Sequence, residues 1–389
     1  MMSVFTKEVL DNFRDRRVVL NTLILGPLIG PVIFTVMISF MTQQATERME
    51  APLELPVIGA ENAPSLISFL EREGVIIEER PADPEGAIKQ EEEEIILRIP
   101  DDFESAWRAG RPAPLELIAD QSLRYTGTTI SRVRGYLNGY AGQISQVRLQ
   151  LRGVHPDITR PLQITVVDLS TPESRGGMLL AFLPYFIMIT VFMGSMHMAI
   201  DTTAGERERK SLEPLLINPL PRWQIMAGKL LATTLFALLT LALGLIMFVV
   251  SMNFLPIEDM DMALNLDFRV ALLAFTLVAP VALLAAALLT ILASFAKSFR
   301  EAQSYMGMVI LIPMVPSFWI MIDPTRTETW MTLVPLLSQN VLILELVRGE
   351  PLNTVWLGLS FGTTTVLALV LAAIAGTLYN RPKLIFTSD

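Results

Sequence analysis

Six long apolar runs divide the sequence, and most of the segments between them are short and charged. Runs of about 18 apolar residues or more are long enough to cross the hydrocarbon core of a membrane as helices. This pattern predicts an α-helical integral membrane protein with six transmembrane helices. The predicted helices span residues 18–41, 178–200, 230–254, 270–296, 306–322 and 353–379.

A shorter apolar segment, residues 330–347, comes before the last run. Pro335 and the polar sequence Ser338-Gln339-Asn340 interrupt it. The segment is too short to cross a membrane and too apolar for a free loop. We therefore predict a re-entrant helix pair that enters from the outer side, so that residues 230–389 hold the third to sixth helices and this segment.

Residues 42–177 have a different pattern, with many charges and with short strand and helix signals in alternation. This alternation predicts an α/β domain between the first and second transmembrane helices. The predicted strands are residues 55–59, 75–79, 94–99, 115–119 and 164–169, and the predicted helices are residues 63–73 and 103–109.

Apolar side chains also repeat at spacings of three and four within this domain. They are Ile130, Val133, Leu137, Tyr140, Ile144, Val147 and Leu151. A helix that packs its stripe on a sheet shows this spacing. A helix that pairs with a second copy of the domain shows it too, and both interpretations stay open.

Residues 1–17 precede the first apolar run. Phe5, Val9 and Phe13 share one helical face, and charged side chains lie opposite. This arrangement predicts an interfacial helix. A signal peptide is the alternative, but residues 18–41 are too long for its apolar core and no small-x-small cleavage motif follows.

The charged segment 201–229 separates the second and third runs. Asp201 and the two following threonines are good helix caps, so we expect a short amphipathic helix to begin there and a second one at Arg222. In one interpretation the leucines of this segment lie on the bilayer surface. In the other, the segment is a coupling helix that docks into a soluble motor subunit. Its candidate contact residues are Glu206, Arg207, Glu208, Arg209, Leu212, Leu215 and Leu216.

His197 and Asp201 lie one turn apart at the end of the second predicted helix, on the same face. They are candidates for a gate or a proton-sensitive pair. The alternative is a histidine that extends to the interface and an acid that ends the helix.

Composition excludes several kinds of site. The chain has no cysteine and only two histidines, so it has neither a disulfide framework nor a thiolate or histidine-cluster metal site. No Gly-x-x-x-x-Gly-Lys-[Ser/Thr] motif is present, so the chain does not bind ATP phosphates by that route. We predict a non-catalytic chain without a cofactor of its own.

The distribution of charge predicts the orientation. Most of the net charge of −9 falls in residues 42–177, which argues against a nucleic-acid partner. Basic residues collect on one side of the predicted helices, which places both termini and residues 201–229 in the cytoplasm and the acidic domain outside. That side carries Lys7, Arg14, Arg16, Arg17, Arg207, Arg209, Lys210, Arg222, Lys229, Lys297, Arg300, Arg381 and Lys383, against Arg269, Arg326 and Arg348 in the opposite short loops.

The motif GERERKSLEPLLINPLPRWQIMAGK, which begins at Gly205, resembles the coupling loop of type-2 ABC exporter permeases. KEVLDNFRDRR is similar to the N-terminal elbow helix of that family. IILRIPDDFESAWRAGRPAPLELIADQS resembles the family's extracytoplasmic domain. VPLLSQNVLILELVRGE and SFAKSFREAQSY resemble its NatB-like, sodium-efflux branch.

The resemblance implies a permease subunit in the bacterial cytoplasmic (inner) membrane that moves a substrate outward. Two copies of a separate ABC ATPase subunit would bind ATP and magnesium. A second permease chain would complete the pathway, expected as a homodimer and alternatively as a pair with a paralogue. An accessory protein outside the membrane is a further expected partner. In the family, the residue that matches Glu206 tethers the coupling loop to neighbouring helices and the ATPase.

The substrate stays open between two classes. The resemblance implies sodium, yet no acidic or basic residue lies in the middle of a predicted helix, where ion pathways usually have them. Methionines near His197 and in the fifth predicted helix favour a lipid-like or amphipathic drug molecule. A membrane-anchored sensor with an outer receptor domain is a more distant hypothesis, since no cytoplasmic output domain is evident.

Overall fold

The computed structural model describes residues 1–50, 52–81, 83–90, 92–120, 126–159, 179–211, 220–255, 266–322 and 327–378. The chain divides into two compact units. We call residues 1–44 with 169–389 the helical unit, and residues 45–168 the α/β unit. Each unit is described by itself.

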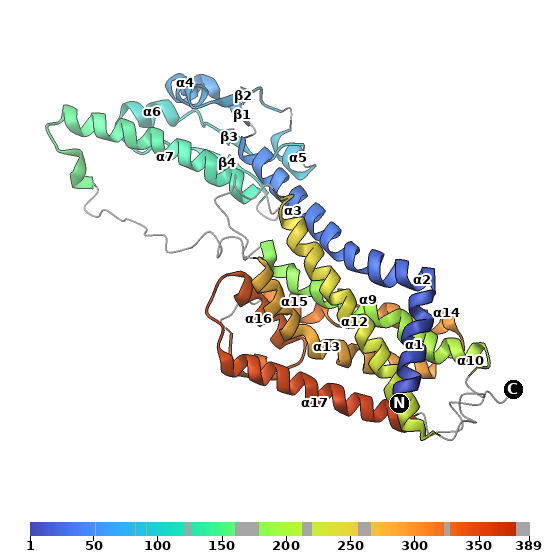
Figure 1. Cartoon of the computed structure of the whole chain (residues 1–389). Coiled ribbons are helices and arrows are strands. Elements are labelled where there is room, and N and C mark those ends of the chain that lie inside the picture. The colour runs from blue at the N-terminus through green and yellow to red at the C-terminus, as the bar shows by residue number, and fades with distance from the viewer. Residues whose placement is uncertain are drawn as a thin grey trace. The chain divides into compact units, whose positions relative to one another are not determined.

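The helical unit contains six helical segments long and apolar enough to cross a membrane, as the hydrophobic pattern predicts. It begins with α1 (Met2–Arg14), α2 (Arg16–Val18), the π-helical η1 (Val19–Leu25) and α3 (Gly26–Glu50). It continues with η4 (Leu179–Phe182), α9 (Leu183–Ile200), α12 (Arg222–Met252), α13 (Phe268–Phe295), α14 (Phe299–Val309), α15 (Met314–Ile322), η7 (Thr329–Leu333), α16 (Leu337–Val347) and α17 (Thr354–Leu378) (Figure 1).

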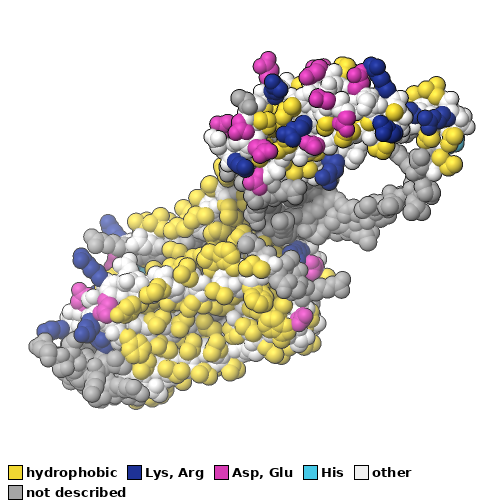
Figure 2. All heavy atoms as spheres, turned by 180° about the vertical axis from the view of Figure 1, so that it is seen from behind, with side chains coloured by type: hydrophobic (Ala, Val, Ile, Leu, Met, Phe, Trp, Pro, Cys, Tyr) yellow, Lys and Arg dark blue, Asp and Glu magenta, His cyan; other side chains and the backbone are white. Residues whose placement is uncertain are grey.

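The surface of the helical unit matches a lipid environment. Figure 2 shows a face that is covered by hydrophobic side chains, with acidic and basic groups gathered toward its ends. The visible face of the α/β unit carries mixed acidic and basic side chains instead. Charged side chains are costly in the hydrocarbon core of a membrane, whereas apolar side chains are not. The helical unit is therefore the part suited to the membrane.

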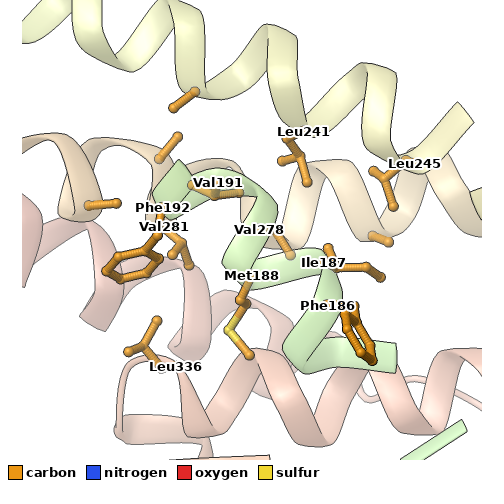
Figure 3. Close-up of a cluster of buried hydrophobic side chains, with 14 of the residues drawn as sticks. Phe186, Ile187, Met188, Val191, Phe192, Leu241, Leu245, Val278, Val281 and Leu336 are labelled. Carbon is orange, nitrogen blue, oxygen red and sulfur yellow. The ribbon is translucent and has the colours of Figure 1, made fainter. Parts of the chain in front are cut away.

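α9 forms the centre of the bundle. Its side chains pack against Leu241 and Leu245 of α12 and against Val278 and Val281 of α13, as Figure 3 shows. Most of α9 is buried by protein. The helix that leads into the charged segment is therefore held firmly by its neighbours.

The charged segment does not start a new helix at Asp201, and that prediction was wrong. α9 continues without a break through η5 (Asp201–Gly205), which is π-helical, into α10 (Glu206–Glu208). The hydroxyls of Thr202 and Thr203 donate to backbone carbonyls four residues earlier instead of capping a helix. Protein contacts bury both side chains, and this burial lets the helix extend past the first charge.

The fifth predicted helix also differs from the prediction. It begins earlier, at Phe299, and it is interrupted between α14 and α15. Residues 310–313 form a turn, and Pro313 is its last residue. Proline lacks the N–H group that a continuous helix needs and clashes with the preceding turn, so the apolar run crosses as two pieces.

Segment 330–347 forms η7 followed by α16. Leu336 joins them with a φ angle of 70°, a left-handed backbone that is rare for leucine. Every residue of α16 is buried. Gln339 compensates the break, because its side-chain oxygen accepts from the Leu336 N–H at 2.7 Å.

Gln339 also links α16 to α17. Its side-chain nitrogen donates to the hydroxyls of Ser360 at 3.1 Å and Thr364 at 2.8 Å, and Ser360 donates to Ser338 at 2.8 Å. All four side chains are fully buried. Inside a membrane bundle such polar contacts join helices, because no water replaces a lost partner.

We expect Gln339→Leu to lower the stability of the helical unit by about 1–2 kcal/mol, since it leaves buried hydroxyls and the Leu336 N–H without their partner. The measurement is unfolding in mixed SDS micelles followed by circular dichroism. Gln303→Leu makes the same change at an exposed position of α14 and should have little effect. Equal losses in the two variants would contradict a role for the buried network.

The α/β unit is built on one mixed sheet of order β2-β1-β3-β4. β1 pairs in parallel with β2 and β3, and β4 pairs antiparallel with β3. Four predicted strands are therefore present, while the one expected at residues 164–169 lies outside the described residues. The elements are β1 (Leu53–Ile58), η2 (Ala60–Asn62), α4 (Pro64–Arg72), β2 (Val75–Glu78), α5 (Pro84–Lys89), β3 (Ile96–Arg98), α6 (Phe103–Arg108), β4 (Glu116–Ile118), α7 (Thr126–Leu151) and η3 (Pro156–Thr159).

The repeating apolar stripe lies on α7. Val133 and Tyr140 are buried in the core with the sheet and α4. Tyr140 also stacks on Trp107 and contacts Phe69. Toward the end of the helix the stripe is exposed, with Leu151 84% accessible. Packing on the α/β core therefore accounts for most of the stripe.

Candidate functional site

One helical turn of the helical unit carries four alternating charges, Glu206 to Arg209. It lies at the end of the unit where α1 also lies (Figure 1). The helix ends here, because Lys210 adopts a left-handed φ of 55°. Each of the four charged side chains contacts a different partner, and we call this stretch the charged turn.

Lys229 of α12 pairs with the first of these charges. Its ammonium lies 2.6 Å from Oε2 of Glu206, 3.4 Å from Oε1 of Glu8 on α1, and 2.9 Å from the Thr202 carbonyl oxygen. The side chain of Lys229 is only 1% exposed. Its hydrogen bonds to Glu8 and to the Thr202 carbonyl, together with the ion pair to Glu206, compensate for its removal from water.

α1 supplies the outer part of this cluster. Val4, Glu8 and Asn12 form its buried face, and Lys7 lies 3.1 Å from Glu8 and 3.7 Å from Glu206. Two lysines and two glutamates therefore form a cluster, which we call the ion cluster, and its Lys7 also lies 3.8 Å from Asp11. Buried charges are tolerated when they are paired in this way.

Close backbone approach makes the contact between α1 and α12 possible. Gly228 precedes Lys229, and a Cβ atom on this glycine would lie 3.0 Å from both the Met1 carbonyl oxygen and the Val4 Cβ atom. A larger residue would separate the two helices. The glycine therefore helps Glu8 to reach Lys229.

Arg207 and Glu208 extend toward the turn between α13 and α14. The guanidinium group of Arg207 donates to the carbonyl oxygens of Ala296 at 3.0 Å and Ser294 at 3.1 Å. The carboxylate of Glu208 accepts from the Phe299 N–H at 2.7 Å. A cation thus meets the carbonyl end of one helix and an anion meets the amide end of the next, as helix dipoles favour.

The two residues of the predicted gate pair, Asp201 and His197, bind different partners, and the fourth charge is the partner of Asp201. Arg209 forms an ion pair with Asp201 at 2.9 Å, within the same continuous helix. His197 is half-buried, and its ring contacts the Phe299 ring at 5.8 Å between centroids. Asp201 and His197 are thus engaged with different partners, and their role as a gate stays a prediction.

The structure brings together the four predicted charges but describes only part of the predicted contact face. Leu212, Leu215 and Leu216 lie outside the described residues. Sequence reasoning missed Glu8 and Lys229. The available signals were the i, i+4 spacing of Glu8 and Asn12 on a helix that already has an apolar face, and a lysine seven residues into the helix that begins at Arg222.

The contacts of the charged turn link several helices of the unit. No group of three or more metal-binding side chains occurs among the residues that the structure describes. The charged turn instead joins α1, α12, α13 and α14 through ion pairs and hydrogen bonds. A force applied to this turn would act on all four of these helices.

The chain is similar to known transporter proteins. A family model described as "ABC-2 family transporter protein" matches residues 22–376. The chain is also similar to "ABC transporter permease protein NatB" of Bacillus subtilis (strain 168), with 26% identity over 387 residues, 98% of each chain.

Proposed function

Because this chain belongs to the ABC-2 family of transporter proteins, we propose that it is the membrane-spanning subunit of an ABC exporter. A separate ATPase subunit hydrolyses the ATP, and closure of two such subunits pushes on the charged turn. The permease chain itself is non-catalytic in this proposal.

The observation that carries the proposal is the set of contacts made by the charged turn. Glu206 binds Lys229 of α12 and Lys7 of α1. Arg207 binds the end of α13, and Glu208 binds the start of α14. A surface loop resting on lipid would not need fixed contacts to four helices. An element that receives force from outside the membrane does need them.

The rest of the assembly follows from the charge distribution and the number of helices. In the proposed orientation, which the distribution of basic residues supports, both termini and the charged turn face the cytoplasm and the α/β unit lies outside. The proposal keeps α16 as a re-entrant helix that enters from the outer side. Two permease chains would surround one pathway in the bacterial cytoplasmic membrane. The α/β unit is then free to meet an accessory protein outside.

Sodium efflux is the first candidate activity. Its support is the similarity to the NatB permease along 98% of both chains. Hydroxyl, amide and carbonyl oxygens are suitable ligands for a hard monovalent cation, and the buried polar side chains of α16 and α17 supply such oxygens inside the bundle.

Export of an amphipathic molecule is the second candidate. A pocket of about 210 Å³ lies between α12 and α13 and is lined entirely by apolar side chains. Among its lining residues are Phe268 and Phe275, which offer aromatic surface to a lipid-like substrate.

The test is ATP hydrolysis by this chain with its co-encoded ATPase in lipid nanodiscs, with sodium or amphipathic compounds added. Activity should depend on the chain and rise with sodium. Glu206→Gln should reduce the sodium-stimulated part about tenfold, which corresponds to about 1.4 kcal/mol of coupling. Glu104→Ala, at an exposed site of α6, is the control and should change little.

The outcomes separate the candidates. If only amphipathic compounds stimulate ATP hydrolysis, the second candidate activity is favoured and sodium efflux is contradicted. If no ATPase associates with the chain, the exporter proposal is wrong. If the Glu206→Gln variant and the parent chain hydrolyse ATP at the same rate, the charged turn does not transmit the movement of the ATPase.

A further inference from the structure

Arg207 and Glu208 hold both ends of the turn that joins α13 to α14. Arg207 binds the last carbonyls of α13, and Glu208 binds the first amide of α14. The bonded residues are 87 to 91 positions away in sequence. We propose that these two side chains form a clamp that carries movement of the charged turn to α14, which rests on the proposed function above.

The signs of the two charges fit the clamp. The end of α13 presents carbonyl oxygens with partial negative charge, and the start of α14 presents amide hydrogens with partial positive charge. Adjacent residues of opposite sign match these two ends. Exchanging the two charges would place each of them against a like partial charge.

The same turn is anchored on its other side. Glu206 precedes the clamp directly and binds the buried ammonium of Lys229 at 2.6 Å. Residues 206–208 therefore connect α12 with the α13–α14 turn through consecutive side chains. When the charged turn moves, either α14 follows or the bond between Glu208 and Phe299 breaks.

α14 is the element best able to move in response. It is separated from α15 by the turn at residues 310–313, and only a narrow stripe of α14, α15 and this turn is buried within the chain. That stripe consists of Ala302, Met306, Val309, Pro313 and Ser317. A short helix with few buried contacts shifts at lower cost than α9 or α13, which lie in the core.

The clamp allows a matched pair of variants at Phe299, whose N–H donates to Glu208. Phe299 is the first residue of α14, where proline is tolerated, and Ser298 before it is extended at φ −139° and ψ 163°, as a residue before proline must be. Phe299→Pro removes the N–H that Glu208 binds. Phe299→Ala removes the same ring but keeps that N–H.

The experiment measures the position of α14 in the full complex with the co-encoded ATPase in nanodiscs. The chain has no natural cysteine, so spin labels at Ser304→Cys on α14 and Val36→Cys on α3, both exposed, are specific. Labelled chain is diluted with unlabelled chain, and the distance is measured by double electron–electron resonance without nucleotide and with magnesium-ATP and vanadate.

In the parent chain and in Phe299→Ala the distance should shift on trapping with vanadate. In Phe299→Pro and Glu208→Ala that shift should be lost, while Glu104→Ala, at an exposed site of α6, should keep it. Loss of the shift in Phe299→Ala as well, or its persistence in Phe299→Pro and Glu208→Ala, would overturn the clamp. Absence of ATPase binding by the parent chain would instead overturn the proposed function.

Discussion

Replacing Lys229 with methionine is expected to lower the stability of the helical unit by about 3–5 kcal/mol. Methionine fits the space of the lysine stem and leaves Lys7 beside the carboxylates of Glu8 and Glu206, which lose their buried ammonium. Those side chains are only 4% and 7% exposed, so water cannot replace it. Unfolding in mixed SDS micelles, followed by circular dichroism, measures the loss.

Two further variants test the physical cause. Lys7→Met removes a lysine from the same cluster, but Lys7 is 49% exposed, and the loss should stay below about 1 kcal/mol. Adding Glu206→Gln to Lys229→Met removes one of the two carboxylates that lost the Lys229 ammonium, and it should recover part of the stability. Additive losses in the double variant would show that the ion cluster does not act as a unit.

The second large effect is expected at Gly194. Replacing this residue with leucine should cost about 3 kcal/mol, at the upper end for overpacking. A Cβ atom at position 194 would already lie 2.6 Å from Oγ1 of Thr240. Leucine would therefore separate α9 from α12, which together place the charged turn beside Lys229.

The contact at Gly194 has a counterpart one turn along both helices. Thr190 lies against Gly244, where an added Cβ would be 2.9 Å from the threonine Cγ2. Each helix thus presents a threonine and a glycine four residues apart, and each glycine receives the threonine of the other helix. Small residues at this spacing let helices in membranes approach closely.

The matched control is Gly376→Leu on α17, where the glycine has open space around it and the loss should be small. An exchange of the pair, Gly194→Thr with Thr240→Gly, should recover most of the stability. Thermal unfolding in nanodiscs compares the variants. If Gly376→Leu is as damaging as Gly194→Leu, leucine itself and not the close crossing is responsible.

Local patterns in the sequence were enough to predict much of the architecture. The lengths of the apolar runs indicate six membrane helices, because hydrocarbon thickness sets the number of residues required. Apolar side chains that alternate along the chain predicted four strands of the α/β unit. Apolar side chains at spacings of three and four predicted α7. The run Glu206 to Arg209 was recognisable as a candidate site from its charges alone.

Tertiary contacts decided the features that local patterns could not show. The helix continues past Asp201 because other helices bury Thr202 and Thr203, whereas the sequence shows only a charge and two residues that favour caps. Glu8 and Lys229 lie 221 positions apart, and neither has a local partner that reveals the pairing. An electrostatic contact between distant segments depends on how their helices pack, so the ion cluster and the clamp on α14 became visible only in the folded chain.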